Sequence, residues 1–465
     1  MKALNAIRVG GKDVLPLIEG GKGISISNGA SAGAWAGAGG IGTVSCVNAD
    51  YFDAQGRRVP QVYHGRTRQE RHEELIDYGI KGGLAQVHEA YEQSSGNGWI
   101  NINVLWEMGG AQRVLHGVLE RARDLIHGVT CGAGMPYKLG EIAARYGVHY
   151  YPIISSGRAF RALWKRAYHK FSELLGGVVY EDPWLAGGHN GLSSSEDPLA
   201  PEAPYPRIVE LRRTMNEFGL HDTPIIMAGG VWFLRDFEDW IDNPEVGPIC
   251  FQFGTRPLLT KESPIPEQWK QRLMTLHEGD VQLHRHSPTG FYSSAVRNDF
   301  LRELDDRNDR QVAYTAEPVG EHQVPFSPGA RKTSVFLTAG DARRVEAWQG
   351  QGFTEAMRTP DQTFIFVAPG KQREIQQDQA ACMGCLSACR FSNWADHGDF
   401  SNGKKADPRS FCIQKTLMDI AHGGDLDENL MFAGHSAYRF ARDPFYSNGF
   451  VPTVKQLVDR ILTGD

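Results

Sequence analysis

The sequence has no long apolar run and no excess of basic residues. No hydrophobic stretch approaches the ~20 residues that a membrane-spanning helix needs, and Met1–Gly23 lacks the apolar core and small-residue cleavage site of a signal peptide. Acidic residues outnumber basic ones, 55 to 49, for a net charge of −6. Because nucleic-acid and anionic-lipid binders need clustered Lys and Arg, we expect a cytoplasmic protein with no membrane and no nucleic-acid partner.

The sequence also lacks the paired cysteines of a disulfide framework. It has seven cysteines, an odd number, and three of them fall within the eight residues from 382 to 389. Such crowding argues for a metal site in a reducing compartment.

From Leu15 to Leu276, short apolar runs alternate with amphipathic stretches. The apolar runs predict strands at Gly40–Cys46, Trp99–Leu105, Leu125–Thr130, His149–Ile154, Gly177–Tyr180, Pro224–Ala228 and Pro248–Phe253. The stretches between them predict helices such as Gln112–Ala122, Leu139–Tyr146, Ala159–Leu175 and Ile208–Phe218. Continuous apolar strands separated by helices are typical of a parallel sheet buried on both faces.

The positions of the glycines favour a closed barrel over an open doubly wound sheet. Glycines follow the predicted strands at 39–40, 132 and 134, 187–188, 229–230 and 254. A Rossmann domain concentrates its glycines in one strand-to-helix turn, whereas a barrel lines one end with many such loops. We therefore predict an α/β protein, a (β/α)8 TIM barrel with a C-terminal cysteine-cluster extension.

Beyond Leu276 the alternation stops. The polar stretch Gly279–Lys332 predicts an extension on the barrel, followed by a small α/β insertion and a cysteine-bearing tail. The predicted elements are strands Ser334–Leu337 and Thr363–Val367 and helices Asp341–Gln349 and Val454–Leu462. This divides the chain into a barrel (1–280), an extension (281–370) and a C-terminal segment (371–465).

Two successive strands end in glycines that suit a phosphate. Ile225–Ala228 leads into Gly229-Gly230, and Phe251–Phe253 leads into Gly254-Thr255, each before a predicted helix. Glycine permits close backbone approach, and amides at a helix N-terminus point at an anion. TIM barrels often bind phosphate between the loops of strands seven and eight.

The loop Glu181–Gly191 holds a histidine, His189, after Gly187-Gly188. A histidine between glycines at the C-terminal end of a barrel strand is open to a ligand and titrates near neutral pH. His189 is therefore the candidate acid or base, with a loop histidine bonded to a carbonyl as the alternative.

These motifs together resemble the nitronate monooxygenase (2-nitropropane dioxygenase) family of FMN-dependent TIM-barrel oxidoreductases. The similarity follows the barrel through Ile18–Gly23, Gly39–Gly42, Ile102-Asn103, Ala186–His189, Ala228–Gly230 and Gln252–Arg256. The resemblance implies FMN contacts from Asn103, Gly188, Gly229, Gly230, Gln252, Gly254 and Thr255. It also assigns His189 as the base that takes a proton from the carbon next to the nitro group.

Two positions depart from the family pattern. Lys22, the second candidate catalytic residue, stands where family members commonly have Met. A cation there would favour the anionic reduced ring of the flavin or bind an acidic substrate; the alternative is a surface lysine. Asn190 replaces a basic residue that often follows the histidine, and the His-Asn pair is similar to that of related flavin enoyl reductases. Reduction of an activated C=C bond is therefore an alternative to nitronate oxidation.

Four cysteines predict a metal centre. Cys382, Cys385 and Cys389 form a C-x2-C-x3-C run, and Cys412 follows after 22 residues. Such a run with a distant fourth cysteine favours an iron–sulfur cluster, with zinc or unliganded thiols as alternatives. The run resembles the [4Fe-4S] segment of barrel flavoproteins such as dienoyl-CoA reductase and trimethylamine dehydrogenase. The tail Glu428–Arg439 is similar to the C-terminus of a longer, cluster-bearing branch of the nitropropane dioxygenase family.

The remaining cysteines, Cys46, Cys131 and Cys250, are expected to be small buried hydrophobes, with Cys131 the one that could face the pocket. The sequence as a whole predicts an FMN-dependent oxidoreductase whose [4Fe-4S] cluster passes electrons to or from the flavin. NAD(P)H or a redox partner protein such as ferredoxin is the expected donor, and a homodimer is compatible with the sequence. Two rivals remain open: a zinc-stapled phosphate-binding lyase or isomerase, and a non-catalytic iron–sulfur sensor.

Overall fold

A computed structural model describes residues 1–465 except 10, 97 and 330–332. Eight parallel strands close into a barrel in the order β10-β11-β3-β4-β5-β6-β7-β8. Their bounds are Leu17–Glu19 (β3), Ile41–Ser45 (β4), Trp99–Leu105 (β5), Gly128–Gly132 (β6), His149–Ile154 (β7), Val178–Glu181 (β8), Ile225–Ala228 (β10) and Ile249–Phe253 (β11). The predicted TIM barrel is confirmed.

Helices surround the barrel. They are Gly29–Gly37 (α1), Arg68–Gln93 (α2), Ala111–Ala122 (α3), Leu139–Tyr146 (α4), Gly157–Arg166 (α5) and Pro204–Glu217 (α6). The elements that directly follow β10 and β11 are 3-10 helices, Leu234–Trp240 and Arg256–Leu259. The C-terminal helix α13 (Val454–Leu462) packs against α1 and buries its apolar face in the main core, so the end of the chain completes the outer ring.

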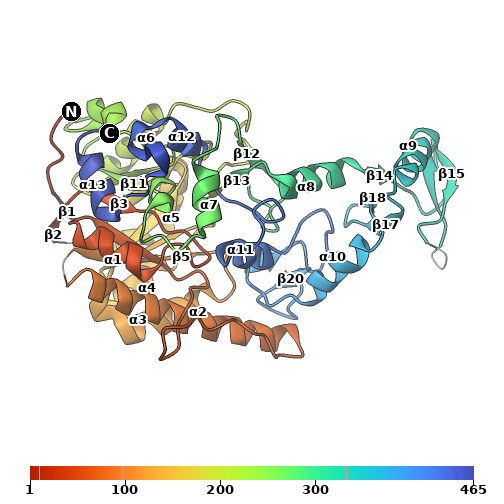
Figure 1. Ribbon diagram of the computed structural model, residues 1–465, viewed down its shortest axis with the longest axis horizontal. Helices are drawn as coiled ribbons and strands as arrows, with labels where there is room; N and C mark the ends of the chain where they lie inside the picture. The colour runs from red at the N-terminus through yellow and green to blue at the C-terminus, as the bar shows by residue number, and fades with distance from the viewer. Residues whose placement is uncertain (10, 97, 330–332) are drawn as a thin grey trace.

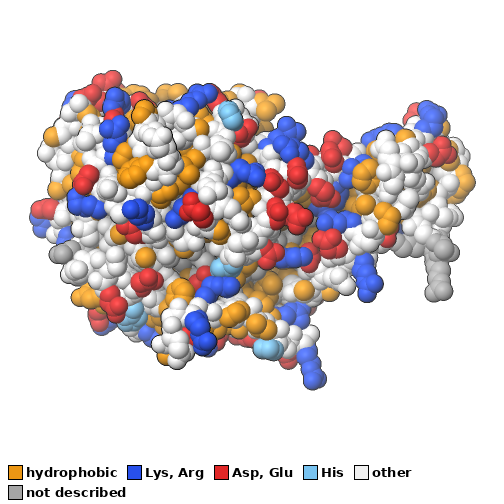
Figure 2. All heavy atoms as spheres, in the orientation of Figure 1, with side chains coloured by type: hydrophobic (Ala, Val, Ile, Leu, Met, Phe, Trp, Pro, Cys, Tyr) orange, Lys and Arg blue, Asp and Glu red, His pale blue; other side chains and the backbone are white. Residues whose placement is uncertain are grey.

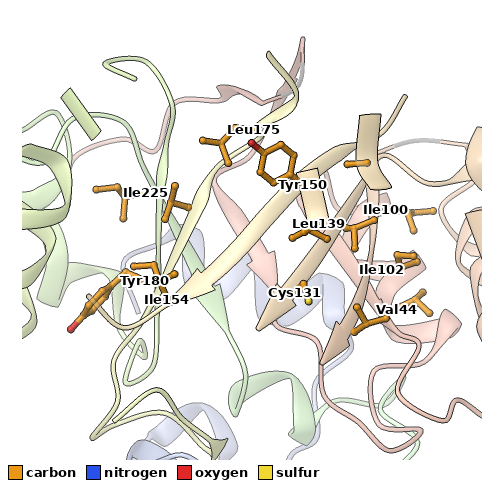
Figure 3. Close-up of a cluster of buried hydrophobic side chains, with 14 of the residues drawn as sticks. Val44, Ile100, Ile102, Cys131, Leu139, Tyr150, Ile154, Leu175, Tyr180 and Ile225 are labelled. Atoms are coloured by element: carbon orange, nitrogen blue, oxygen red, sulfur yellow. The ribbon is translucent and has the colours of Figure 1, made fainter. Parts of the chain in front are cut away.

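Alternating side chains of the strands fill two apolar layers. Ile225 and Tyr150 point outward into the layer between strands and helices, part of which is drawn in Figure 3. Their neighbours Ile226 and Tyr151 point inward and fill the barrel. This alternation is that of strands covered on both faces. It leaves the loops at the C-terminal ends of the strands as the place for a site.

A second region extends from the barrel (Figure 1). Strand β12 (Val281–His284) pairs with β13 (Ser293–Val296), and β13 pairs with β9 (Gly188–His189), which lies in the loop after β8. Helix α8 (Asp299–Asp309) then leads outward to an arm with an apolar core of its own. The arm contains β14 (Gln311–Ala313), β15 (His322–Phe326), β16 (Val335–Thr338), α9 (Ala339–Gly350), β17 (Glu355–Arg358) and β18 (Thr363–Val367). Acidic and basic side chains are interspersed over the face shown in Figure 2.

The chain returns from the arm through α10 (Lys371–Ala380) to the cysteine segment, which we define as residues 382–412. It includes β19 (Ala388–Cys389) and β20 (Trp394–Ala395) and is followed by α11 (Ile413–Ala421). Short helical segments, among them α12 (Arg439–Arg442), lead to α13. The remaining elements are β1 (Ile7–Val9) and β2 (Lys12–Val14) before the barrel and α7 (Glu267–Leu273) after it.

Several predicted elements differ from the structure. The strand predicted at Leu125–Thr130 is β6, three residues later at its start, and the helix predicted at Ala159–Leu175 ends at Arg166 before two 3-10 turns. The polar stretch Gly279–Lys332 is not only a barrel extension, because its second half builds α8 and part of the arm; residues 330–332 lie outside the described part. The division of the chain at 280 and 370 stays a prediction. No described helix is both long and apolar enough to span a bilayer.

Candidate active site

A cavity opens at the C-terminal ends of the barrel strands. The volume open to water-sized spheres inside it is about 230 Å³, just below the ~300–1,000 Å³ of an ordinary small-molecule site. Its walls include every candidate barrel residue: Lys22, Asn103, Gly188, His189, Gly229, Gly230, Gln252, Gly254 and Thr255. The closed barrel therefore brings all of these candidates around one cavity.

The two glycine loops present open backbone groups to this cavity. Among the described residues, neither Gly229 nor Gly254 takes part in a hydrogen bond. A Cβ built on Gly254 would meet no atom within 4 Å, and Gly229 and Gly230 have φ angles of +83° and +75° that favour glycine. Thr255 Oγ1 accepts a hydrogen bond from the Gly434 amide at 3.1 Å, which leaves its hydroxyl proton to donate. The helices expected behind these loops are 3-10 helices rather than α-helices.

Two side-chain amides lie next to these loops. Asn103, on β5, and Gln252, on β11, line the cavity. A Cβ on Gly21 would lie 2.4 Å from Asn103 Cβ, and one on Gly20 would lie 3.3 Å from Gln252 Nε2. The Gly20-Gly21 pair is therefore required for the loop after β3 to lie against both amides.

Lys22 lines the cavity but is not a free cation. Its Nζ lies 3.1 Å from Oε1 of Glu19 and donates to the Gly20 carbonyl at 2.7 Å. Glu19 is 1 % exposed and also accepts a hydrogen bond from Ser31 at 2.8 Å. The surface alternative does not hold either, because the Lys22 side chain is only 16 % exposed. The positive charge of Lys22 is therefore balanced by an ion pair with the buried Glu19.

His189 sits on the edge strand β9, opposite Ser293 of β13. Its Nε2 lies 2.7 Å from Ser287 Oγ, and its ring meets Phe432 edge-on at 5.6 Å. Burial lowers the pKa of His189 to about 4, so the imidazole is neutral at neutral pH and able to accept a proton. Asn190 does not line the cavity; its side-chain oxygen accepts from the Leu192 amide.

Glu181, the last residue of β8, also lines the cavity, although no motif in the sequence marks it as a site residue. Burial, and to a smaller degree the neighbouring Asp182, raises the pKa of Glu181 to about 8. The carboxyl group is therefore largely protonated at neutral pH. The sequence places this residue at a strand end, but its desolvation arises only from the closed fold.

The four cysteines of the predicted centre lie close enough to influence one another. Burial raises the pKa of Cys385, and the thiols of Cys412, Cys389 and Cys382 add to that shift. Backbone N–H groups also point at the sulfurs: that of Gln414 at Cys385, that of Lys415 at Cys412, those of Ser392 and Phe391 at Cys389. Cys382 Sγ accepts from the Gly384 amide at 3.4 Å and from the Ser392 hydroxyl at 3.1 Å. Every thiol thus has a hydrogen-bond donor.

The cysteine segment is attached to the loop that follows β5. The Gly109 amide donates to the Cys385 carbonyl at 3.0 Å, and both the amide and the hydroxyl of Ser387 donate to Glu107 at 2.7 Å. On α2, Arg71 Nε donates to the Cys382 carbonyl at 3.0 Å. These contacts place Cys385 in the wall of the same cavity as His189.

The cavity wall does not include the other three ligand candidates. No group of three or more His, Cys, Asp or Glu side chains in the described part of the chain is arranged to hold a metal ion. Cys46, Cys131 and Cys250 are fully buried in the barrel and away from the cavity wall, as expected.

Solved structures share this architecture at low sequence identity. FabK from Thermotoga maritima is 15% identical over 97% of this chain and 92% of its own, with a TM-score of 0.52. The enoyl reductase domain of MlnA, from the macrolactin biosynthesis cluster of Bacillus amyloliquefaciens, is 11% identical over 97% and 93%, with a TM-score of 0.53. A nitroalkane oxidase from Streptomyces ansochromogenes is 19% identical over 62% and 78%, with a TM-score of 0.46. No curated protein matches the chain.

A family model supplies the assignment that these likenesses cannot. The model for nitronate monooxygenase matches residues 12–464, nearly the whole chain. The glycine loops and His189 lie within that match, around one cavity. The chain belongs to the nitronate monooxygenase family and is a flavin-dependent oxidoreductase.

Proposed function

We propose that the protein binds FMN in the barrel cavity and a [4Fe-4S] cluster on its four clustered cysteines, and that it reduces an activated C=C bond with electrons delivered through the cluster. One observation carries the proposal: Cys385 lies in the wall of the cavity that also contains His189 and the glycine loops. A one-electron centre against that wall is of little use to a simple oxidase and of direct use to a reductase.

The cavity fits FMN. The unbonded amides of Gly229 and Gly254, with the Thr255 hydroxyl, suit a terminal phosphate, and the empty space at Gly254 is where a Cβ would intrude. Asn103, Gly188, Gly230 and Gln252 would hold the remainder through amide groups and close backbone approach. FMN, when bound, supplies hydride or single-electron transfer, and the chain supplies position and charge.

The donor chemistry of the four cysteines supports an iron–sulfur cluster, and binding would require their thiols to move into a ligand arrangement that the described residues do not have. The donor set is all sulfur, and N–H donors face each thiol, as hydrogen bonds to sulfur do in such sites. Cys412 is the N-cap of α11, whose positive end acts against the burial that raises the pKa of this thiol to about 12. The cluster, when bound, supplies one-electron transfer.

Two groups of the chain can move protons in the cavity. Reduction of a C=C bond requires a proton for the second carbon, and the Glu181 carboxyl holds one at neutral pH because burial raises its pKa to about 8. His189 is neutral and can accept a proton. Lys22 would act only as the ion-pair partner that holds Glu19 in place.

Nitronate oxidation is the second candidate function. A neutral His189 is the form needed to take a proton from the carbon next to a nitro group, and the family description names this chemistry. The enoyl reductase domain among the similar structures supports the reductase instead.

Anaerobic purification tests the proposal. We expect bands near ~370 and ~450 nm from flavin and a shoulder near ~400 nm from the cluster, with iron and sulfide bound. NAD(P)H or a reduced ferredoxin, the proposed donors, should bleach the flavin, and a panel of enoyl thioesters, quinones and nitronates should then identify the acceptor. Colourless, zinc-containing protein would favour the lyase or isomerase, and a cluster with no turnover from any donor would favour the sensor.

A further inference from the structure

A chain of two hydroxyl groups leads away from His189. Ser287 Oγ lies 2.7 Å from His189 Nε2, and Thr289 Oγ1 lies 2.8 Å from Ser287 Oγ. Ser287 is 1 % exposed, whereas Thr289 is half-buried and reaches the surface. The two hydroxyl groups therefore connect His189 at the cavity to solvent through hydrogen bonds alone.

The backbone holds both hydroxyl oxygens in place. Ser287–Gly290 is a β-turn: the Gly290 amide donates to the Ser287 carbonyl at 3.0 Å, and Gly290 has a φ of +84°. The Thr289 amide points at Ser287 Oγ at 3.4 Å, and the Phe291 amide donates to Thr289 Oγ1 at 3.2 Å. Each hydroxyl oxygen can consequently go on accepting its backbone hydrogen bond while the hydroxyl proton turns from one neighbour to the other.

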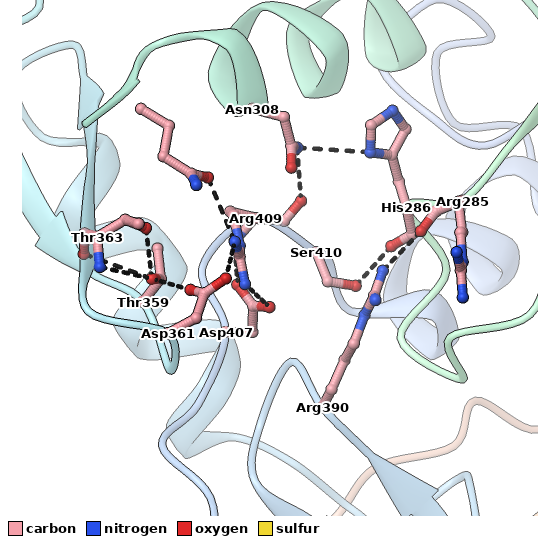
Figure 4. Close-up of polar contacts among 11 residues, drawn as sticks. Arg285, His286, Asn308, Thr359, Asp361, Thr363, Arg390, Asp407, Arg409 and Ser410 are labelled. Carbon is pink, nitrogen blue, oxygen red and sulfur yellow. Dashed lines mark hydrogen bonds and ion pairs between the residues drawn. The ribbon is translucent and has the colours of Figure 1, made fainter. Parts of the chain in front are cut away.

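The cysteine segment clamps this turn. Arg390, next to Cys389, donates from its amide to the Pro288 carbonyl at 3.1 Å and from Nη2 to the Arg285 carbonyl at 2.7 Å. Ser410 Oγ donates to the His286 carbonyl at 2.7 Å; the two side-chain contacts are drawn in Figure 4. The turn is thus held between β9 and the segment that carries the thiols.

Other described ionisable groups face His189 but make no hydrogen bond to Ser287 or Thr289. His284 of β12 lies across Ser293 on the same face of the small sheet, and burial lowers its pKa to about 3, so it is neutral. His286 stacks on His284 at 5.7 Å and pairs with Asp305 of α8 at 2.8 Å. Glu181 faces the cavity from β8.

We propose that Ser287 and Thr289 form a proton relay that exchanges protons between His189 and solvent during turnover. The hydrogen bond to Ser287 is the one bond of the His189 ring among the described residues, so Nδ1 is left for the cavity. When Nδ1 takes a proton from a substrate, the Nε2 proton passes to Ser287, the Ser287 proton to Thr289, and the Thr289 proton to water. The reverse shift reloads the ring, and no net charge remains on either hydroxyl. Ser287 and Thr289 are positioning residues that act through His189; this role rests on the proposed function of that histidine.

Exchange of the His189 imidazole N–H with water measures the relay without a substrate. In FMN-loaded protein labelled with ¹⁵N-histidine, we expect Ser287→Ala to slow this exchange at least tenfold and Thr289→Val to slow it less. Ser294→Ala is the matched control. It removes a similar serine–histidine hydrogen bond, between Ser294 Oγ and His435 Nε2 at 3.1 Å, that involves neither His189 nor the two relay hydroxyls. The His189 signal is assigned by its loss in His189→Ala.

Wild-type exchange rates in both Ser287→Ala and Thr289→Val would overturn the relay. Slowed exchange with unchanged turnover of propyl-2-nitronate and crotonyl-CoA would overturn its part in the reaction. Failure of the proposed function has a different signature: His189→Ala would then turn over both compounds like the wild type, whatever the exchange rates. Thr289→Val retains the buried Ser287, so it tests the relay even if Ser287→Ala does not fold.

Discussion

The barrel and the cysteine segment contribute different chemical groups to the wall of the cavity. The barrel wall presents backbone amides, amide side chains and ionisable groups that burial holds neutral, namely His189 and Glu181. Another part of the wall presents Cys385, from a segment whose apolar core includes the cysteines themselves. The fold of the barrel part of the wall therefore does not depend on a metal. The packing of the cysteine segment, in contrast, depends on where its thiols lie.

The largest expected effect follows from that difference. Cys385→Ser should abolish cluster binding, with loss of iron and of the ~400 nm shoulder, and should leave FMN bound because the phosphate loops lie in the barrel. Cys131→Ala is the control, since Cys131 is a fully buried barrel thiol outside the cavity wall. Full iron content in Cys385→Ser would contradict the assignment of this thiol as a ligand.

The second effect concerns chemistry within the barrel wall. His189→Ala should lower turnover by ~10²–10⁴-fold, the usual contribution of a general acid or base, and leave FMN bound. His116→Ala is the control, because His116 lies on α3 and bonds Tyr146 at 2.8 Å, away from the cavity. Steady-state kinetics on the acceptor found with the wild type give the comparison; equal turnover in the two variants would remove His189 from the mechanism.

The third effect concerns the empty space at a phosphate loop. Gly254→Ala should fold normally, because the new methyl group meets no atom within 4 Å, but it would occupy the space that we assign to phosphate. We expect FMN affinity to fall at least tenfold, about 1.4 kcal/mol, with an unchanged melting temperature of the FMN-free protein. Gly350→Ala, an equally open glycine of α9, should change neither quantity. Unaltered FMN binding in Gly254→Ala would place the phosphate elsewhere.

The difference between these two parts of the wall also explains what the sequence could predict. Each barrel motif is short and local, so strand ends and glycines pointed to His189 and Gly254, and the family resemblance added Asn103. The structure then brought all of them to one cavity. Charge was not predictable: the pairing of Lys22 with Glu19 and the desolvation of Glu181 depend on the closed barrel.

The missed elements have physical reasons. Strand β3 is three residues long, too short for a periodic signal. Helix α1 is rich in glycine, which is a poor helix former, but a Cβ on Gly29 or Gly33 would lie 2.6 Å from a carbonyl oxygen of α2. Close packing of α1 on α2 therefore requires glycine at these positions, although helix propensity alone would predict a loop for this segment. The Ser287–Thr289 relay was invisible because it meets His189 across 98 residues of sequence.

The smallest effect we expect is on stability and comes from Glu181. Its carboxyl has an ordinary pKa of 4.5 and a pKa of about 8 in the folded protein, mainly because of burial. Between these values the folded state keeps a proton that the unfolded state has lost, so stability falls as pH rises through this window and levels off above it. Glu181→Gln removes the titration, and its melting temperature should exceed that of the wild type by about 2 °C or more at pH 8 and converge with it near pH 5. Glu346→Gln, an exposed carboxyl of α9, should follow the wild-type curve throughout. Parallel curves for Glu181→Gln and the wild type would show that Glu181 is ionised in the cavity, and the proton donor for a reductase would then have to be sought at His189.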